Sequence, residues 1–284
     1  MRPRRIVIWL NGRFTPLSKA RISPLDRGFL YGDGIFETIR ADRGKISWLS
    51  THVERLQESL SLLRITLDPT PDWKYTLQRL LEENRLDSGV AAIKIIVTRG
   101  ISNRLGLPAP QKPTVCATAT SYDPPQRESY DTGWKLHVYT EGRAPALSRF
   151  KSLNYLFFLT ARQAAVDVGC DMAVILDHHG FVTETCAGTL LAKTDGQWWT
   201  PQSSFQLPGT TLRCLSAIME NSGLKIEARA ARIEDFFSAQ TVWTLNSLIG
   251  IMPVVQIDGH PLPDPAPVEA GYWRARLFEV ENVE

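Results

Sequence analysis

Several features are scarce in this 284-residue chain, and each scarcity excludes a class of protein. No stretch approaches the ~18 consecutive apolar residues that a membrane helix needs, and the apolar run at 6–10 is too short for the core of a signal peptide. The chain has only four cysteines, at positions 116, 170, 186 and 214. Because no two of them form a C-x-x-C pair, neither a zinc motif nor a redox motif is indicated, and no metal site is predicted. These absences predict a cytoplasmic protein with reduced thiols that does not bind membranes.

The chain also has little excess of charge of either sign. The 32 basic and 30 acidic side chains leave a formal net charge of +2, and the basic residues form no stripe. A nucleic-acid partner is therefore not indicated, and a small-molecule substrate fits better. Apolar residues make up 43% of the chain and charged residues 22%, which are globular proportions and exclude a disordered or fibrous protein.

Strand-like and helix-like patterns alternate along the chain. Apolar residues at 53, 56, 60 and 63 recur with a helical period, whereas 34–40, 91–98 and 172–176 are typical of strands. Proline at 124 and 125 marks the best linker candidate. These patterns predict an α/β (α+β mixed) fold with a small N-terminal α/β domain at 1–120, a linker at 121–130 and a larger C-terminal domain at 131–284. The seam between two such halves is the expected ligand site.

Lysine is outnumbered, with 9 lysines against 23 arginines, so lysine chemistry has few candidates. A covalent amine catalyst needs a lysine whose environment favours the neutral amine. Two lysines, Lys94 and Lys151, lie among apolar neighbours. Strand alternation would point Lys94 to solvent. Lys151 stands where an apolar helix, expected over 154–168, would begin, and a helix N-terminus disfavours a positive charge. The alternative for either residue is a side chain that packs its stem and keeps its charge in water.

A second candidate lies at 207–213, where Gly209, Thr210 and Thr211 precede an apolar-periodic helix. Glycine allows close approach of the backbone, and unpaired N–H groups at a helix start bind anions. The motif therefore indicates a phosphate site, although the same residues also occur at ordinary helix starts.

Two charged residues complete the candidates. Arg55, on the first amphipathic helix, can hold a phosphate with two nitrogens, or pair on the surface with Glu54 or Glu58. Glu184 follows a turn and begins a segment of small residues, which suits close approach to a flat ligand. A glutamate that faces solvent from a strand is the alternative.

Taken together, these motifs resemble the class IV fold of pyridoxal-phosphate (PLP) enzymes. That family includes branched-chain aminotransferases, D-amino-acid aminotransferases and 4-amino-4-deoxychorismate lyases. The resemblance covers nearly the whole chain, and its motifs occur in family order: Asp26-Arg27-Gly28, Tyr31-Gly32-Asp33-Gly34-Ile35-Phe36-Glu37-Thr38, His52-x-x-Arg55-Leu56, Lys151-Ser152-Leu153-Asn154, Glu184 and Gly209-Thr210-Thr211.

The resemblance implies a two-domain fold, PLP as cofactor and a homodimer. It implies that Lys151 bonds to PLP and shuttles protons, and that Glu184 pairs with the pyridine nitrogen. The other implied contacts are Arg55, Thr210 and Thr211 to the phosphate, Tyr155 to the ring hydroxyl, and Tyr31 and Arg104 to substrate carboxylates. Two positions depart from the family pattern: Thr189 replaces an asparagine, and Leu212 separates Thr211 from Arg213.

Three features favour the lyase within this family. Thr38 follows Phe36-Glu37, Asn246 lies in the segment N-S-L-I-G-I-M-P-V, and Arg104 lacks the histidine partner of D-amino-acid aminotransferases. The resemblance therefore predicts β-elimination of 4-amino-4-deoxychorismate to 4-aminobenzoate and pyruvate, a step in folate biosynthesis. Thr38 would help protonate the departing pyruvate carbon, and Asn246 would position the substrate carboxylate.

Other interpretations stay open. Thr38 can be an ordinary strand residue, and Asn246 a turn residue at the end of a strand. A class IV aminotransferase that uses 2-oxoglutarate with D-amino or branched-chain amino acids would need the same Lys151, Glu184 and Arg55. A PLP-binding protein without turnover is the third possibility.

Overall fold

The computed structural model describes residues 6–109 and 112–279, which fall into two compact units. The first unit comprises Met1–Pro124 and Phe150–Asn154, and the second comprises Pro125–Arg149 and Tyr155–Glu284. The change of unit at Pro124 falls inside the segment that the sequence marks as a linker. The chain then returns to the first unit for the short segment that contains Lys151. The predicted domain limits, 1–120 and 131–284, stay a prediction.

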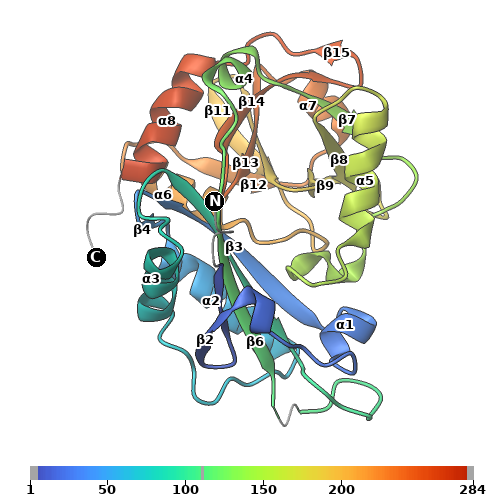
Figure 1. The fold of residues 1–284 in the computed structure, drawn as a ribbon. Helices are drawn as coiled ribbons and strands as arrows, with labels where there is room; N and C mark the ends of the chain where they lie inside the picture. Colours follow the sequence, from blue (N-terminus) through green and yellow to red (C-terminus); the bar gives the residue numbers. More distant parts are fainter. Residues whose placement is uncertain (1–5, 110–111, 280–284) are drawn as a thin grey trace. The chain divides into compact units, whose positions relative to one another are not determined.

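Within its described residues, the first unit is built on a six-stranded antiparallel sheet with the order β2-β1-β6-β5-β3-β4 (Figure 1). The strands are β1 (Val7–Leu10), β2 (Arg13–Pro16), β3 (Gly34–Asp42), β4 (Lys45–Ile46), β5 (Val90–Thr98) and β6 (Thr114–Ser121). Asn11 and Gly12 close the β1–β2 hairpin with positive φ angles, as an Asn-Gly pair favours.

Two longer helices pack against this sheet. The helical elements of the unit are η1 (Leu17–Lys19), α1 (Arg27–Tyr31), α2 (Leu49–Leu62) and α3 (Trp73–Glu83). Helix α2 contacts β3, and α3 contacts β1 and β6. The Asp72 carboxylate caps α3 by accepting from the Tyr75 amide at 3.0 Å.

Alternation along β3 and β5 gives the sheet two different faces. Ile35, Ile39, Ile93 and Ile95 belong to the core cluster of this unit. Phe36, Thr38 and Lys94 therefore lie on the opposite face. The pairing register sets Thr38 opposite Lys94.

The second unit holds a larger mixed sheet, whose described strands run in the order β12-β11-β10-β13-β14-β7-β8-β9, with β15 beside β14. The bounds are β7 (Trp134–Val138), β8 (Met172–Leu176), β9 (Val182–Thr185), β10 (Thr189–Thr194), β11 (Gln197–Pro201), β12 (Ile226–Arg229), β13 (Thr241–Asn246), β14 (Gly250–Ile257) and β15 (His260–Pro261). The pairs β11–β12, β14–β7 and β7–β8 are parallel. A mixed α/β fold class is therefore confirmed.

Helices cover the sheet of the second unit. They are α4 (Arg127–Thr132), η2 (Ala146–Arg149), α5 (Leu156–Asp167), α6 (Thr210–Glu220), α7 (Ile233–Phe237) and α8 (Pro267–Glu279). Helix α5 runs along β7 and β8, and α8 contacts β14 (Figure 1). Among the residues that the structure describes, no helix combines the length and the apolar character needed to cross a membrane.

Candidate active site

Lys151 is held by the first sheet and not by a helix. Its carbonyl accepts from the Phe36 amide at 2.8 Å, and the Leu153 amide donates to the Gly34 carbonyl at 3.0 Å. These bonds join the segment to β3 through an isolated antiparallel bridge between Ile35 and Ser152. Helix α5 begins only at Leu156, so the expectation that Lys151 lies at a helix N-terminus is wrong. The physical reason is that backbone pairing with β3, far away in the sequence, takes up the segment before the helix begins.

The two lysines with apolar neighbours meet at one aromatic ring. The Nζ of Lys151 lies 4.8 Å from the centroid of the Phe36 ring, and that of Lys94 lies 5.1 Å from it. Lys94 is exposed, as strand alternation predicts. Thr38, half-buried, lies on this same face two residues after Phe36. This face of β3 therefore gathers two amines and a hydroxyl-bearing residue around Phe36.

The core face of β3 carries a buried charge cluster. The Glu37 carboxylate accepts from Arg55 Nε at 2.8 Å and Arg55 Nη2 at 2.7 Å, and His52 Nδ1 lies 2.7 Å from Glu37 Oε2. All three side chains are at least nine-tenths buried. His52 and Arg55 are three residues apart on α2, a spacing that directs both toward β3. The interpretation of Arg55 as a surface residue paired with Glu54 or Glu58 is therefore wrong.

Burial and pairing set the protonation of this cluster. Burial alone would raise the pKa of Glu37, but the hydrogen bonds and charges of His52 and Arg55 lower it to about 2. Burial lowers the pKa of His52, and the charges of Arg55 and Lys151 add to this against the raising effect of Glu37. His52 is therefore neutral at pH 7. Because an ionised carboxylate only accepts hydrogen bonds, the proton of neutral His52 is on Nδ1.

The Glu184 carboxylate is buried in the second unit. Glu184 lies on β9, is 5% exposed, and its Oε1 accepts a long hydrogen bond of 3.4 Å from the Leu207 amide. The interpretation of Glu184 as a solvent-facing strand residue is therefore wrong. A buried carboxylate suits a role in which it pairs with a protonated ring nitrogen.

Tyr155 lies close to Glu184. Its hydroxyl donates to the Cys186 carbonyl at 3.1 Å. Burial raises the pKa of Tyr155, and the nearby charges of Glu184 and Cys186 raise it further. The phenol therefore keeps its proton at physiological pH and remains a hydrogen-bond donor.

The predicted phosphate loop ends at the N-terminus of α6, which begins at Thr210 with Gly209 as its N-cap. Because Gly209 has no side chain, it cannot cap the N–H groups of the first turn of this helix. A Cβ at Gly209 would lie only 2.3 Å from Thr189 Oγ1, so no side chain fits there. Thr189, which departs from the family pattern, thus packs directly against the loop. The arrangement fits a bound phosphate, because the backbone N–H groups of the first turn point outward beside two threonines.

Asn246 stabilises a turn. Its Oδ1 accepts from the amides of Leu248 and Ile249, both at 3.0 Å, and its Nδ2 donates to the Ala187 carbonyl at 3.1 Å. The structure therefore shows Asn246 as a turn residue at the end of β13. Its contact with a substrate carboxylate stays a prediction.

The two predicted carboxylate-binding residues of the first unit are linked through Arg27. Tyr31 ends α1, and the guanidinium carbon of Arg27 lies 5.1 Å from its ring centroid. Arg27 also donates to the Arg104 carbonyl at 2.8 Å. The side chains of Tyr31 and Arg104 are both exposed.

The predicted residues thus divide between the two units. The first contains Tyr31, Thr38, Arg55, Arg104 and Lys151, and the second contains Tyr155, Glu184, Thr210, Thr211 and Asn246. The sequence assigned no role to Glu37 or His52, although both lie in the family motifs. The signal for His52 was its spacing of three from Arg55, and that for Glu37 was a carboxylate on the core face of an apolar strand.

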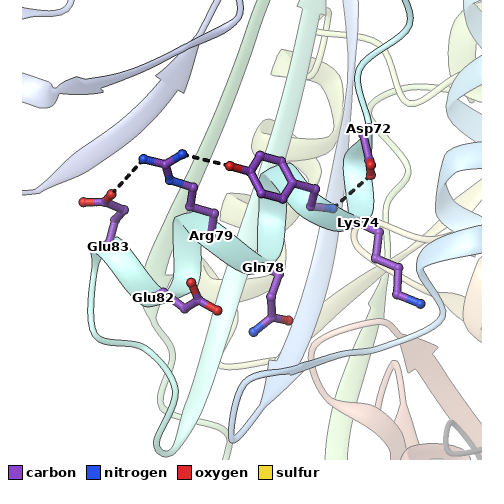
Figure 2. A pocket seen from close by; sticks show the side chains of 7 residues that line it. Asp72, Lys74, Gln78, Arg79, Glu82 and Glu83 are labelled. Carbon is purple, nitrogen blue, oxygen red and sulfur yellow. Dashed lines mark hydrogen bonds and ion pairs between the residues drawn. The ribbon is translucent and has the colours of Figure 1, made fainter.

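A separate hollow lies on the outer face of α3 and takes in none of these residues (Figure 2). Arg79 donates there to the Tyr75 hydroxyl at 2.8 Å and pairs with Glu83 at 3.6 Å. These charges compensate one another on an exposed helix surface, so this hollow is not the candidate active site.

Comparison with known proteins decides the family. The family model described as amino-transferase class IV matches residues 34–257. A putative branched-chain-amino-acid aminotransferase of Methanocaldococcus jannaschii is 32% identical over 262 residues, which cover 89% of this chain and 88% of that protein. This chain belongs to the class IV aminotransferase family. A D-alanine aminotransferase of Staphylococcus epidermidis is also 32% identical to this class IV protein, over 90% of this chain and 91% of that protein.

Solved structures agree with this assignment. The T.th. branched-chain amino acid aminotransferase, complexed with N-(5'-phosphopyridoxyl)-L-glutamate, has a TM-score of 0.83 and 26% identity to this chain, with 97% of this chain and 93% of that chain covered. PLP is therefore the cofactor of this class IV enzyme. The donors present fit that group: an amine for its aldehyde, a buried carboxylate for its ring nitrogen and a helix N-terminus for its phosphate.

Proposed function

We propose that this class IV enzyme is an aminotransferase that moves the amino group of a D-amino or branched-chain amino acid to 2-oxoglutarate. The observation that carries this proposal is that two relatives at 32% identity, each matched over about nine-tenths of this chain, are named aminotransferases. The site contributes the amine, carboxylate and anion-binding groups that such a reaction needs.

Each side chain has one proposed task. PLP, when bound, supplies an electron sink for the negative charge that develops at the substrate's α carbon. Lys151 holds the cofactor through Nζ and moves a proton at that α carbon. Glu184 keeps a proton on the pyridine nitrogen. The remaining cofactor contacts are Arg55, Thr210 and Thr211 to the phosphate and the Tyr155 hydroxyl to the ring oxygen.

The substrate carboxylate needs cationic or hydrogen-bonding partners. We assign this task to Arg104 and Tyr31, which Arg27 links. Asn246 is a third candidate, although its amide already stabilises a turn and contacts Ala187. Its effect on substrate binding would then come from the shape of that turn.

The test combines a spectrum with a product assay. Purified protein is loaded with PLP and incubated with panels of D- and L-amino acids and 2-oxoglutarate, and glutamate formation is measured. Lys151→Ala should lose both the visible absorbance of covalently held cofactor and all turnover. Lys94→Ala is the matched control for the absorbance, because its amine contacts the same Phe36 ring and should leave the spectrum in place. Turnover by Lys151→Ala at the wild-type rate would overturn the proposal.

Aminodeoxychorismate lyase is the second candidate. The observation that favours it is Thr38, which lies on the Phe36 face of β3 two residues from that ring. The same preparation is supplied with 4-amino-4-deoxychorismate, and 4-aminobenzoate and pyruvate are measured. Their formation without any glutamate formation would replace the aminotransferase with the lyase, and Thr38→Ala should then slow it. A protein that takes up no PLP would favour the non-catalytic alternative.

We also propose a homodimer, on the basis of exposed apolar side chains on and around α1 and the neighbouring loop. Phe29 is 77% exposed and Leu105 is 92% exposed. The two segments are joined because Arg27 of α1 donates to the Arg104 and Gly106 carbonyls. Exposed apolar side chains gathered in this way are typical of a protein interface. A second copy of the chain is the proposed occupant.

The proposed compartment is a reducing one, the cytoplasm. No disulfide joins any two of the four cysteines, and three of them are buried. Burial raises the pKa of Cys116 and of Cys186, which keeps these thiols protonated and unreactive.

A further inference from the structure

A buried carboxylate joins two arginines between α1 and β3. Asp33 Oδ2 accepts from Arg27 Nε at 2.6 Å and from Arg99 Nε at 2.8 Å. The Arg99 side chain is fully buried, and those of Arg27 and Asp33 are 8% exposed. Burial would raise the pKa of Asp33, but the hydrogen bonds and charges of Arg99 and Arg27 outweigh it and lower that pKa. Asp33 therefore stays ionised and holds both guanidinium groups by one edge.

Arg27 binds one loop through its other edge, and Arg99 binds both the same loop and the C-cap of α2. Arg27 donates from Nη1 to the Arg104 carbonyl at 2.8 Å and from Nη2 to the Gly106 carbonyl at 2.9 Å. Arg99 donates from Nη1 to the Pro108 carbonyl at 2.8 Å and from Nη2 to the Leu63 carbonyl, outside this loop, also at 2.8 Å. The buried side chains of Arg27 and Arg99 thus bind three loop carbonyls, at the alternate positions 104, 106 and 108.

Among the described residues, few other hydrogen bonds hold the loop at 102–108. It contains no helix or strand, and most of its residues are exposed. Its own backbone contributes a hydrogen bond of 3.3 Å from the Arg104 amide to the Ser102 hydroxyl. Gly106 adopts a positive φ of 76°, which glycine tolerates without strain. The conformation of this exposed loop therefore depends on the buried arginines.

Asp33 holds Arg27 in place and helps to hold Arg99. Two guanidinium groups share one carboxylate, so its loss would leave two buried positive charges close together without compensation. Arg27 would then move toward water and its bonds to the Arg104 and Gly106 carbonyls would break, whereas Arg99 would keep its bond to the Leu63 carbonyl.

We propose that Asp33, acting through Arg27 and Arg99, fixes the loop at 102–108 and thereby the position from which Arg104 binds the substrate carboxylate. Asp33 is a positioning residue and touches neither substrate nor cofactor. The proposal rests on the proposed function, because that function assigns the carboxylate to Arg104.

The kinetic test uses a matched pair of substitutions on the PLP-loaded enzyme. Asp33→Asn should raise KM for the amino acid by roughly tenfold, with a smaller change in kcat, because misplacing a binding group weakens substrate binding. Asp42→Asn is the control: Asp42 lies at the end of β3 opposite to Asp33, which precedes that strand, and it accepts two bonds from Arg40. It should leave KM unchanged.

A double substitution tests whether Asp33 acts through Arg104. In an Arg104→Gln background, Asp33→Asn should raise KM by less than about twofold, since the group it positions is already gone. An undiminished tenfold effect in that background would overturn the proposal. If Asp33→Asn does not fold, Arg27→Lys replaces it, because lysine keeps the charge near Asp33 but cannot reach both carbonyls.

Hydrogen exchange supplies a readout that is independent of turnover. Amides at 102–108 should exchange at least about tenfold faster in Asp33→Asn than in wild type, and at the wild-type rate in Asp42→Asn. Unchanged exchange in Asp33→Asn would overturn the proposal that Asp33 fixes this loop. Exchange could instead be faster in Asp33→Asn while the wild type shows no aminotransferase or lyase activity. That result would support the role of Asp33 in fixing the loop and would reject the proposed function.

Discussion

At the scale of single residues, the chemistry of this protein is organised by charges that are buried in pairs. Glu37 neutralises Arg55, and Asp33 pairs with both Arg27 and Arg99. Each carboxylate fixes the plane of a guanidinium that has another task. A buried charge of this kind is costly to leave alone, because the interior cannot solvate it.

The acid dependence of stability tests the Glu37 cluster. The pKa of Glu37 is lowered from 4.5 to about 2, so its stabilising contribution is complete above about pH 4.5 and is lost as the pH falls toward 2. We expect Glu37→Gln to lower the free energy of unfolding at pH 7 by on the order of 3 kcal/mol. This deficit should shrink by about 1.4 kcal/mol for each pH unit below 4.5.

The measurement is urea unfolding of wild type and variant at pH 7, 4.5 and 3. Glu58→Gln, on an exposed position of α2, serves as the control and should follow the wild-type profile. A deficit of Glu37→Gln that is the same at all three pH values would contradict the assignment of an ionised, paired Glu37.

At the scale of elements, short segments are positioned by their partners and not by their own composition. The Lys151 segment pairs with β3, and the start of α6 packs against Thr189 of β10. Gly209 has an ordinary negative φ of −70°, so only the close approach of Thr189 requires glycine there.

A pair of substitutions tests this close approach. Gly209→Ala should lower the free energy of unfolding by about 1–3 kcal/mol, because its Cβ would overlap Thr189 Oγ1. It should also weaken PLP binding, since the loop must shift. Adding Thr189→Ala removes the overlapping oxygen and should restore much of both losses. Thermal unfolding and PLP titration measure the two effects, and a double variant no better than Gly209→Ala would refute the explanation.

Some elements were predictable and others were not. The helical period found α2, and strand-like patterns found β3, β5 and β8, because these elements bury one face or both faces of a regular structure. The path of Lys151 was not predictable, since its pairing joins residues more than a hundred positions apart. The pairing of Glu37 with Arg55 was also not predictable, because a strand and a helix each supply part of the charge cluster and neither sequence pattern shows it alone.

At the scale of the whole molecule, the chain carries exposed apolar side chains that a second copy is proposed to cover. Phe29→Asp should convert the proposed dimer into a monomer, because a carboxylate would have to be buried in the interface. Val268→Asp is the control, since Val268 is 86% exposed on α8 in the other unit. Sedimentation of the PLP-loaded proteins measures the mass. A wild-type protein that is monomeric at all concentrations would contradict the dimer.

The sequence by itself determined the family and the choice of Lys151 as the candidate for bonding to PLP, because the order and residue types of the motifs can be read without a structure. It also separated the halves of the chain at the proline pair. Only the tertiary structure decided that Lys151 is held by β3, that Arg55 is buried against Glu37 and that Asp33 binds the two arginines that hold the loop of Arg104. The physical reason is that these arrangements depend on the register of long-range pairing, which places a charge beside its partner or leaves it in solvent.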